Sequence, residues 1–252
     1  MIRPRVIPCL LLQNRGLVKT VKFKDPKYLG DPINIVRIFN DKEVDELIFL
    51  DITATIEKRR PPFEMLAKIT SECFMPLGYG GGIRSLDDIK ALLSLGIEKI
   101  ILNAYAFEDA GFVREAAAYG GSQAVVISMD VKKNLLGRYE VFTHDGRKAT
   151  GLDPVKHAVA MEKQGAGELF VNSIDRDGTM QGYDLELVRR VSSAVQIPVI
   201  ACGGAGKLQD LADAIKVGGA SAAAAGSMFV FQGPLRAVLI SYPSPEESRI
   251  LL

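Results

Sequence analysis

Two aspartates stand where buried runs of the sequence end. Asp51 lies at the end of the run ELIFLDI at 46–52, and Asp130 closes the run AVVISMD at 124–130. A carboxylate at the end of a buried strand can act as a general acid or base on a ligand held beside it. Either residue could instead be structural, and for Asp51 that role would be to cap the following loop. We expect both to be catalytic carboxylates.

Glycine turns follow two further runs. Gly80-Gly81-Gly82 comes after the run at 75–79, and Gly203-Gly204-Ala205-Gly206 comes after the run at 198–202. Without side chains, the backbone N–H groups of such turns can approach an anion closely, and a following helix adds a favourable dipole. The two turns predict two phosphate sites. The alternative is that both turns serve only close packing of strand on helix.

Charged residues mark the opposite, amino-terminal ends of four runs. They are two cations and two anions, Arg5, Glu46, Lys99 and Glu168. Four such charges converging on the floor of a barrel would ordinarily form a neutral plug of salt bridges that serves stability. A plug that can open would also admit a small polar molecule.

The elements that must position these residues alternate along the chain. Helical segments such as 85–94, opened by Ser85 with Asp88 three residues later, and 154–164, opened by Pro154, separate short apolar runs. Strict alternation requires parallel strands covered on both faces, as in a doubly wound sheet or a closed barrel. Eight strands in 252 residues favour the α/β class and a single (β/α)8 TIM barrel, with ligands at the carboxyl ends of the strands. The expected strands are 5–12, 46–52, 75–79, 99–103, 124–130, 168–172, 198–202 and 222–226.

An internal repeat supports the barrel. A shift of 122 residues places Glu46 on Glu168, Pro76 on Pro198 and Asp88 on Asp210, and it also superposes the two glycine turns without a gap. The repeat predicts one domain, 1–252, built from half-barrels at about 1–120 and 121–240. On this arrangement the two phosphate sites lie on opposite walls.

Two insertions depart from a minimal barrel. Residues 13–31 are rich in lysine and are expected to form a long loop, either a mobile lid over an anion or a solvated surface loop. Residues 138–150 are expected to form a β-hairpin that turns at Asp145 and Gly146. His144 falls in this hairpin and His157 in a helix, so neither is expected to be catalytic.

Composition excludes several classes of protein. The 31 basic and 30 acidic residues nearly cancel, which removes the electrostatic argument for a nucleic-acid or membrane partner. The cysteines Cys9, Cys73 and Cys202 lack metal-ligand spacing and are expected to be reduced thiols. Neither a signal peptide nor an apolar run of eighteen residues occurs. We expect a cytoplasmic protein without a metal or a cofactor.

The motifs together resemble one family along nearly the whole chain, the cyclase subunit of imidazole glycerol phosphate synthase. The resemblance rests on DELIFLDITATIEKR (45–59), YGGGI (79–83), GSQAVV (121–126), GAGELF (165–170), NSIDRDGTMQGYD (172–184) and ACGGAGK (201–207). It implies a barrel that receives ammonia from a glutaminase subunit on its amino-terminal face. The ammonia would then react with a bisphosphorylated substrate at the far end.

The resemblance also implies roles for single residues. Asp130 and Asp51 match the catalytic and supporting carboxylates, and Glu98 matches a position that docks the glutaminase. The ammonia gate of the family is matched by Arg5, Glu46, Lys99 and Glu168. Its phosphate-binding positions are matched by Gly82 and Asn103 at one site and by Asp177, Gly178, Gly204 and Ser227 at the other, with Lys19 as the lysine of the lid.

One departure from the family is serious. Family members cyclise their substrate with two aspartates, and the one that should close the first strand is replaced by Leu11. Loss of one partner of an acid–base pair costs about 100-fold to 10,000-fold in rate. Nearby, Gly78 and Asn172 replace hydroxyl residues, Ala104 replaces a phosphate-binding threonine, and Tyr79 is expected to narrow the interior.

The first-strand stretch CLLL followed by RGLVKTVKF resembles the cyclase-like variants of surface-polysaccharide pathways. That resemblance implies a subunit of an enzyme complex that conducts ammonia from a glutaminase to a third protein, a sugar amidotransferase forming an acetamidino group. Its own cyclase activity would be weakened by Leu11. An authentic cyclase of histidine biosynthesis is the alternative. A weaker alternative is a sugar-phosphate isomerase that belongs to the related barrel family of the same pathway.

Overall fold

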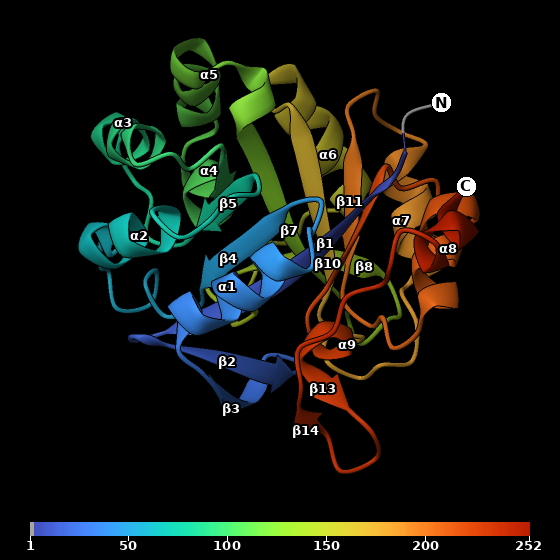
Figure 1. The fold of residues 1–252 in the computed structure, drawn as a ribbon. Coiled ribbons are helices and arrows are strands. Elements are labelled where there is room, and N and C mark those ends of the chain that lie inside the picture. Colours follow the sequence, from blue (N-terminus) through green and yellow to red (C-terminus); the bar gives the residue numbers. More distant parts are fainter. Residues whose placement is uncertain (1–2) are drawn as a thin grey trace.

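The computed structural model describes residues 3–252, and its centre is a closed barrel of eight parallel strands (Figure 1). Successive strands pair side by side, and β10 closes the circle because it pairs with both β7 and β11. The predicted (β/α)8 barrel is therefore confirmed. The barrel strands are β1 (Arg5–Gln13), β4 (Leu47–Asp51), β5 (Leu77–Gly80), β6 (Lys99–Leu102), β7 (Val125–Lys133), β10 (Glu168–Ser173), β11 (Val199–Cys202) and β12 (Ala222–Ala225).

Helices cover the outside of the barrel. The predicted cap of the third helix is present, because the Ser85 side chain accepts from Asp88 N and the Asp88 carboxylate accepts from Ser85 N. None of the helices among residues 3–252 is long and apolar enough to cross a membrane. The helices of the first seven units are α1 (Pro32–Asp41), α2 (Phe63–Thr70), α3 (Leu86–Ser94), α4 (Ala104–Glu108), α5 (Ala110–Gly120), α6 (Pro154–Lys163), α7 (Leu185–Ser192) and α8 (Leu208–Lys216), with a 3-10 turn η1 (Ser122–Ala124).

Alternate residues of each strand face two separate cores. One core fills the space between strands and helices, and the other fills the barrel interior with Ile7, Cys9, Ile48, Ile101, Val126, Phe170, Ile200, Cys202, Ala222 and Ala224. Tyr79 belongs to the outer core, so the expectation that it narrows the interior is wrong. The reason is strand parity, because Gly78 faces Ile48 and Ile101 inside the barrel and its neighbour must face outward.

Residues 13–31 are not an irregular loop. They form an antiparallel hairpin of β2 (Gly16–Val21) and β3 (Lys24–Gly30), joined to the end of β1 by pairs such as Leu11 with Val18. Leu17 and Val18 are buried, and Lys19 is only 6% exposed. Pairing with β1 satisfies the backbone of this segment, which explains why its many charges do not keep it irregular.

The hairpin predicted at 138–150 is confirmed. β8 (Tyr139–Thr143) pairs with β7 and with β9 (Lys148–Ala149), and the turn contains Asp145 and Gly146, both with positive φ. The tip packs closely against its neighbours. A Cβ added to Gly146 would lie 3.1 Å from the side chain of Phe23, in the β2–β3 turn, and 3.2 Å from that of Ile174. The two insertions therefore meet above the barrel.

Equivalent contacts recur at the predicted 122-residue spacing. Leu47 N donates to Pro76 O as Leu169 N donates to Pro198 O. The carboxylate of Asp88 accepts from two backbone N–H groups ahead of α3, and that of Asp210 does the same ahead of α8. These shared contacts are what duplicated half-barrels would have.

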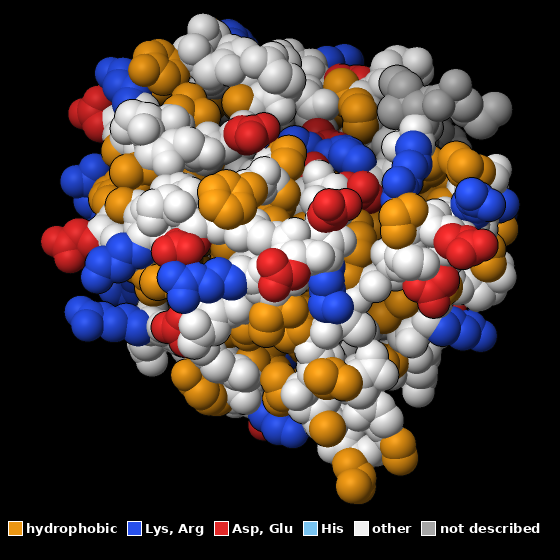
Figure 2. Space-filling model, viewed as in Figure 1, with side chains coloured by type: hydrophobic (Ala, Val, Ile, Leu, Met, Phe, Trp, Pro, Cys, Tyr) orange, Lys and Arg blue, Asp and Glu red, His pale blue; other side chains and the backbone are white. Residues whose placement is uncertain are grey.

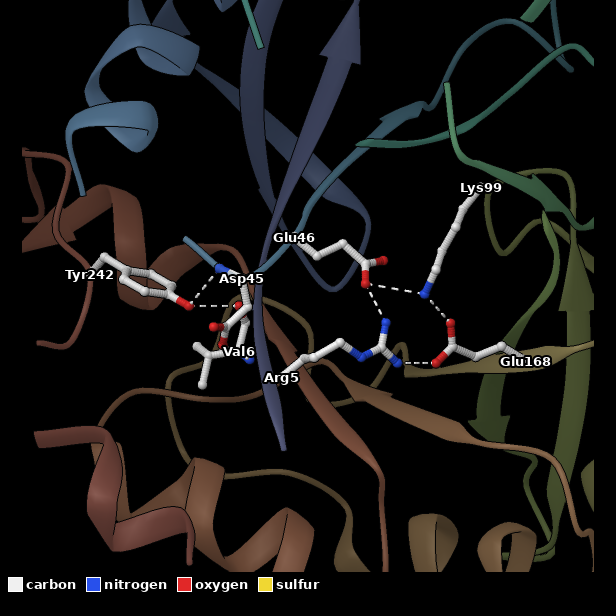
Figure 3. Close-up of polar contacts among 7 residues, drawn as sticks. All are labelled: Arg5, Val6, Asp45, Glu46, Lys99, Glu168 and Tyr242. Carbon is white, nitrogen blue, oxygen red and sulfur yellow. Dashed lines mark hydrogen bonds and ion pairs between the residues drawn. The ribbon is translucent and has the colours of Figure 1, made fainter. Parts of the chain in front are cut away.

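The eighth unit departs from the other seven. In place of a full helix it has the short α9 (Ser227–Val230), a hairpin of β13 (Phe231–Gln232) and β14 (Ala237–Val238), and an extended segment ending in the 3-10 turn η2 (Glu247–Leu251). Tyr242 of this segment donates to Val6 O at 2.9 Å and accepts from Asp45 N at 3.2 Å (Figure 3). The tyrosine thus ties the segment to the start of β1.

Tyr242→Phe is expected to lower the free energy of unfolding by about 1–3 kcal/mol, because it leaves a carbonyl and an N–H group without their partner. Urea unfolding followed by circular dichroism measures the effect. Tyr119→Phe is the matched control, since the Tyr119 side chain is exposed. Equal stability of the two variants would contradict this account of the segment.

Candidate functional site

A pocket opens at the carboxyl ends of the barrel strands. Its wall includes residues from most of the strands, together with the tips of both inserted hairpins, Phe23 and Asp145. The predicted site residues that it brings together are Lys19, Asp51, Gly82, Asn103, Asp130 and Asp177. The pocket is therefore at the end of the barrel where the sequence predicts a ligand.

Asp130 is held by two carboxamides. Asn103 Nδ2 donates to one carboxylate oxygen at 2.8 Å, and Asn172 Nδ2 is 3.3 Å from the other. Burial raises the pKa of Asp130 to about 7, the two amide hydrogen bonds oppose that rise, and the carboxylates of Asp145 and Asp177 add to it. No cation pairs with Asp130 in the described chain, so it can take up or release a proton near neutral pH.

Asp51 has a different environment. One of its oxygens accepts from Thr53 N and Ala54 N at 3.1 and 3.0 Å, and both oxygens lie 3.3 Å from guanidinium nitrogens of Arg59. These contacts are those of a residue that caps the loop after its strand. They fix the carboxylate in place at the pocket wall, and its catalytic role stays a prediction.

The first predicted phosphate position lies on the pocket wall. Gly82 has φ of 71°, and a Cβ there would lie 2.3 Å from Arg59 O, so the glycine is required by a neighbouring backbone. Close packing thus accounts for Gly82 whether or not an anion binds. Ala104 begins α4 beside Asn103 and offers no hydroxyl to an anion.

The β2–β3 hairpin contacts the second predicted position. Lys19 Nζ donates to Asp177 at 2.7 Å, and Thr20 Oγ1 donates to the other oxygen of the same carboxylate at 3.1 Å. Gly178 packs against Thr20 O, where a Cβ would lie only 2.3 Å away. The ammonium of Lys19 is therefore neutralised by Asp177 in this arrangement.

Two other residues predicted for that position do not line the pocket. A Cβ on Gly204 would lie 2.2 Å from Gly182 O, which is again a close backbone contact. Ser227 is buried beside Gly226, and its hydroxyl has no hydrogen-bond partner among the described residues. A hydroxyl in that condition is available to a ligand that reaches this corner.

Sequence reasoning missed Asp145 as a pocket residue. It was identified only as a turn residue, yet its side chain lines the pocket that contains Asp130. Burial raises the pKa of Asp145 to about 6, Arg147 opposes that rise, and Asp177 adds to it. The register was the missing information, since Phe142 pairs with Asp130 and brings the turn three residues later over the pocket.

Leu11 lines the same pocket as Asp130. It pairs with Leu50 on one side and with Val18 on the other, so it continues the apolar interior of the barrel up to the pocket floor. A leucine has no proton to transfer. Among the described pocket carboxylates, Asp130 has no salt bridge, Asp145 has one to Arg147 at 3.9 Å, and Glu108 faces His144 at the same distance.

At the other end of the barrel the four predicted charges form one closed network, which we call the charged ring: Arg5, Glu46, Lys99 and Glu168 (Figure 3). Arg5 donates to both glutamates, and Lys99 also contacts both, at 3.1 Å from Glu46. The glutamates are buried, whereas Arg5 keeps about a third of its side chain exposed. Glu98, beside Lys99, is exposed on the same face.

Asp145→Asn is expected to lower the pKa of Asp130, because it removes a negative charge that favours the protonated form. Carbon-13 NMR of the side-chain carboxyl groups, followed between pH 4 and 9, measures the shift. Asp41→Asn removes the same charge from an exposed position outside the pocket and should leave the titration unchanged. An unchanged Asp130 titration in Asp145→Asn would show that the hairpin tip does not face it.

Similarity to known proteins identifies the family of this chain. The family model for histidine biosynthesis proteins matches residues 5–235. A protein of Pseudomonas aeruginosa with the provisional name imidazole glycerol phosphate synthase subunit hisF2 is 54% identical, over 96% of this chain and 97% of its own length. The imidazole glycerol phosphate synthase subunit HisF of Alkaliphilus metalliredigens is 47% identical over 91% of both chains. The barrel, its pocket and these relatives together place the chain in the HisF family of imidazole glycerol phosphate synthase subunits.

Proposed function

We propose that this chain is the synthase subunit of a glutamine amidotransferase that conducts ammonia through its barrel. The ammonia would come from a HisH-like glutaminase docked on the amino-terminal face around Glu98, and it would serve the amidination of an N-acetyl sugar in surface polysaccharide synthesis. The observation that carries the proposal is an asymmetry between the two ends: the charged ring is complete, whereas the pocket has Leu11 where a second catalytic carboxylate would stand.

The inside of the barrel suits a small neutral molecule. Above the charged ring lies an apolar layer that includes Ile7, Ile48 and Phe170, and above that layer lies the pocket. Neutral ammonia can cross such a layer without placing an unpaired charge in it, whereas ammonium would pay a large free energy of desolvation. In the closed ring each cation contacts both glutamates, so a passage requires these side chains to move.

Asp130 lies at the pocket end, where ammonia would leave the barrel interior. Asp130, with its pKa near neutrality, can accept or donate a proton at the pH of a cell when a molecule in the pocket reacts. Because Asn103 and Asn172 hold it in place, this exchange would occur at a fixed point on the pocket floor.

The alternative function is the cyclase reaction of histidine biosynthesis. One observation favours it, namely that Asp145 shares the pocket with Asp130 and supplies a second carboxylate of raised pKa. The two functions differ in whether ring closure occurs in this pocket.

Glu98→Lys is expected to abolish stimulation of the glutaminase, because it reverses the charge of an exposed side chain at the proposed docking face. Glutamate release by the glutaminase, assayed with and without this chain, measures the effect. Glu115→Lys makes the same change on the exposed surface of α5 and should retain stimulation. Stimulation that survives Glu98→Lys, or that never occurs with the wild-type chain, counts against the proposed assembly.

Leu11→Asp is expected to raise ammonia-dependent turnover of the bisphosphorylated substrate of the histidine-pathway cyclase by about 100-fold or more from a very low wild-type rate, because it restores a proton-transferring group. Absorbance of the released product measures turnover. Leu11→Asn is the control, because asparagine resembles aspartate in size and polarity but cannot transfer a proton in this way, and it should give no gain. A wild-type rate comparable to that of an ordinary cyclase would contradict the proposal and favour the alternative.

A further inference from the structure

The segment that replaces the eighth helix projects away from the barrel. In Figure 1 the β13–β14 hairpin extends below the barrel beside the β2–β3 hairpin. Its turn and second strand expose three large apolar side chains, with Leu235 91% and Leu239 61% exposed and Val238 also exposed. Figure 2 shows hydrophobic side chains gathered on this projection. We call Leu235, Val238 and Leu239 the hairpin patch.

Contiguous exposed apolar residues on a projecting hairpin indicate a surface that a partner covers. The core gains nothing from these side chains, since they point into solvent. A segment serving only to close the barrel would bury such residues, as the following segment does with Tyr242.

Cations surround the base of the hairpin. Lys27 Nζ lies 5.3 Å and Arg236 Cζ 5.1 Å from the centre of the Phe231 ring. Lys22 and Lys24 are exposed on the neighbouring β2–β3 hairpin, where Asp25 is exposed as well, so the cations are in excess. The patch is therefore apolar with a basic margin, which is complementary to an apolar surface with acidic residues around it.

The hairpin is connected to the pocket wall. Arg236 donates to Gly178 O at 2.6 Å, and the residue before Gly178 is Asp177, which binds Lys19. Both hairpins follow the carboxyl ends of barrel strands, so they lie at the pocket end, whereas the charged ring lies at the other end. A protein on the hairpin patch would thus stand at the pocket and leave the amino-terminal face free.

We propose that the hairpin patch docks the enzyme that consumes the ammonia, a protein presenting an apolar surface with an acidic margin. This inference rests on the proposed function. A second copy of this chain fits less well, because a two-fold contact through the patch would bring two basic margins together. Delivery also requires the acceptor at the pocket end, since the proposed glutaminase covers the other.

The test is Leu235→Glu combined with Leu239→Glu, in a mixture of this chain, its glutaminase and the sugar amidotransferase of the pathway. Glutamine-dependent formation of the acetamidino sugar is expected to fall at least 10-fold, while stimulation of the glutaminase stays at the wild-type level. Leu135→Glu with Leu136→Glu, two exposed leucines in the β7–β8 turn, is the matched control and should retain both activities.

The outcomes separate the two proposals. A hairpin variant that forms product at the wild-type rate overturns the docking proposal and leaves the proposed function standing. Loss of a dimer of this chain in the hairpin variant, with product formation unchanged, overturns it in favour of a second copy. A wild-type mixture that forms no product from glutamine overturns the proposed function and the docking proposal with it.

Discussion

Two glutamates buried at one end of a closed barrel require cations beside them, and much of this protein follows from that constraint. Glu46 and Glu168 would each be costly to bury alone, and each is stable because both Arg5 and Lys99 contact it. The four residues come from widely separated parts of the chain. Their network therefore holds the beginnings of four strands in register with one another and leaves the floor of the barrel neutral.

At the pocket end, Lys19 pairs with Asp177 and Arg59 with Asp51, whereas Asp130 has no cationic partner among the described residues. In the folded protein the pKa of Asp130 is about 7, well above the value of about 4 for an unfolded aspartate. The folded state therefore binds more protons between these pH values, and the contribution of Asp130 to stability falls as pH rises from about 4 to about 7. A buried carboxyl group whose pKa allows proton exchange near pH 7 therefore lowers the stability of the folded protein at that pH.

The sequence predicts most of the frame and less of the pocket. Strand alternation and the 122-residue repeat predict the barrel strands and the charged ring, because both depend on regular spacing. The hydrophobic pattern could not predict that residues 13–31 pair with β1. The many lysines of this segment are typical of a solvated loop, although Leu17 and Val18 are buried. The sequence suggested a phosphate contact for Lys19, but its pairing with Asp177 joins residues far apart in the chain, and no local signal marks it.

The same difficulty applies to Asp145 and to the eighth unit. A turn aspartate is ordinary, and it reaches the pocket only because the register of β7 with β8 places it there. The segment after α9 forms a hairpin whose apolar side chains Leu235, Val238 and Leu239 are exposed, and no local pattern marks that arrangement. In both places the chain departs from the repeat at the carboxyl ends of the strands. The ring and the apolar layer above it keep the regular spacing of the barrel, whereas Asp130, Asp145 and the exposed hairpin all lie at the pocket end.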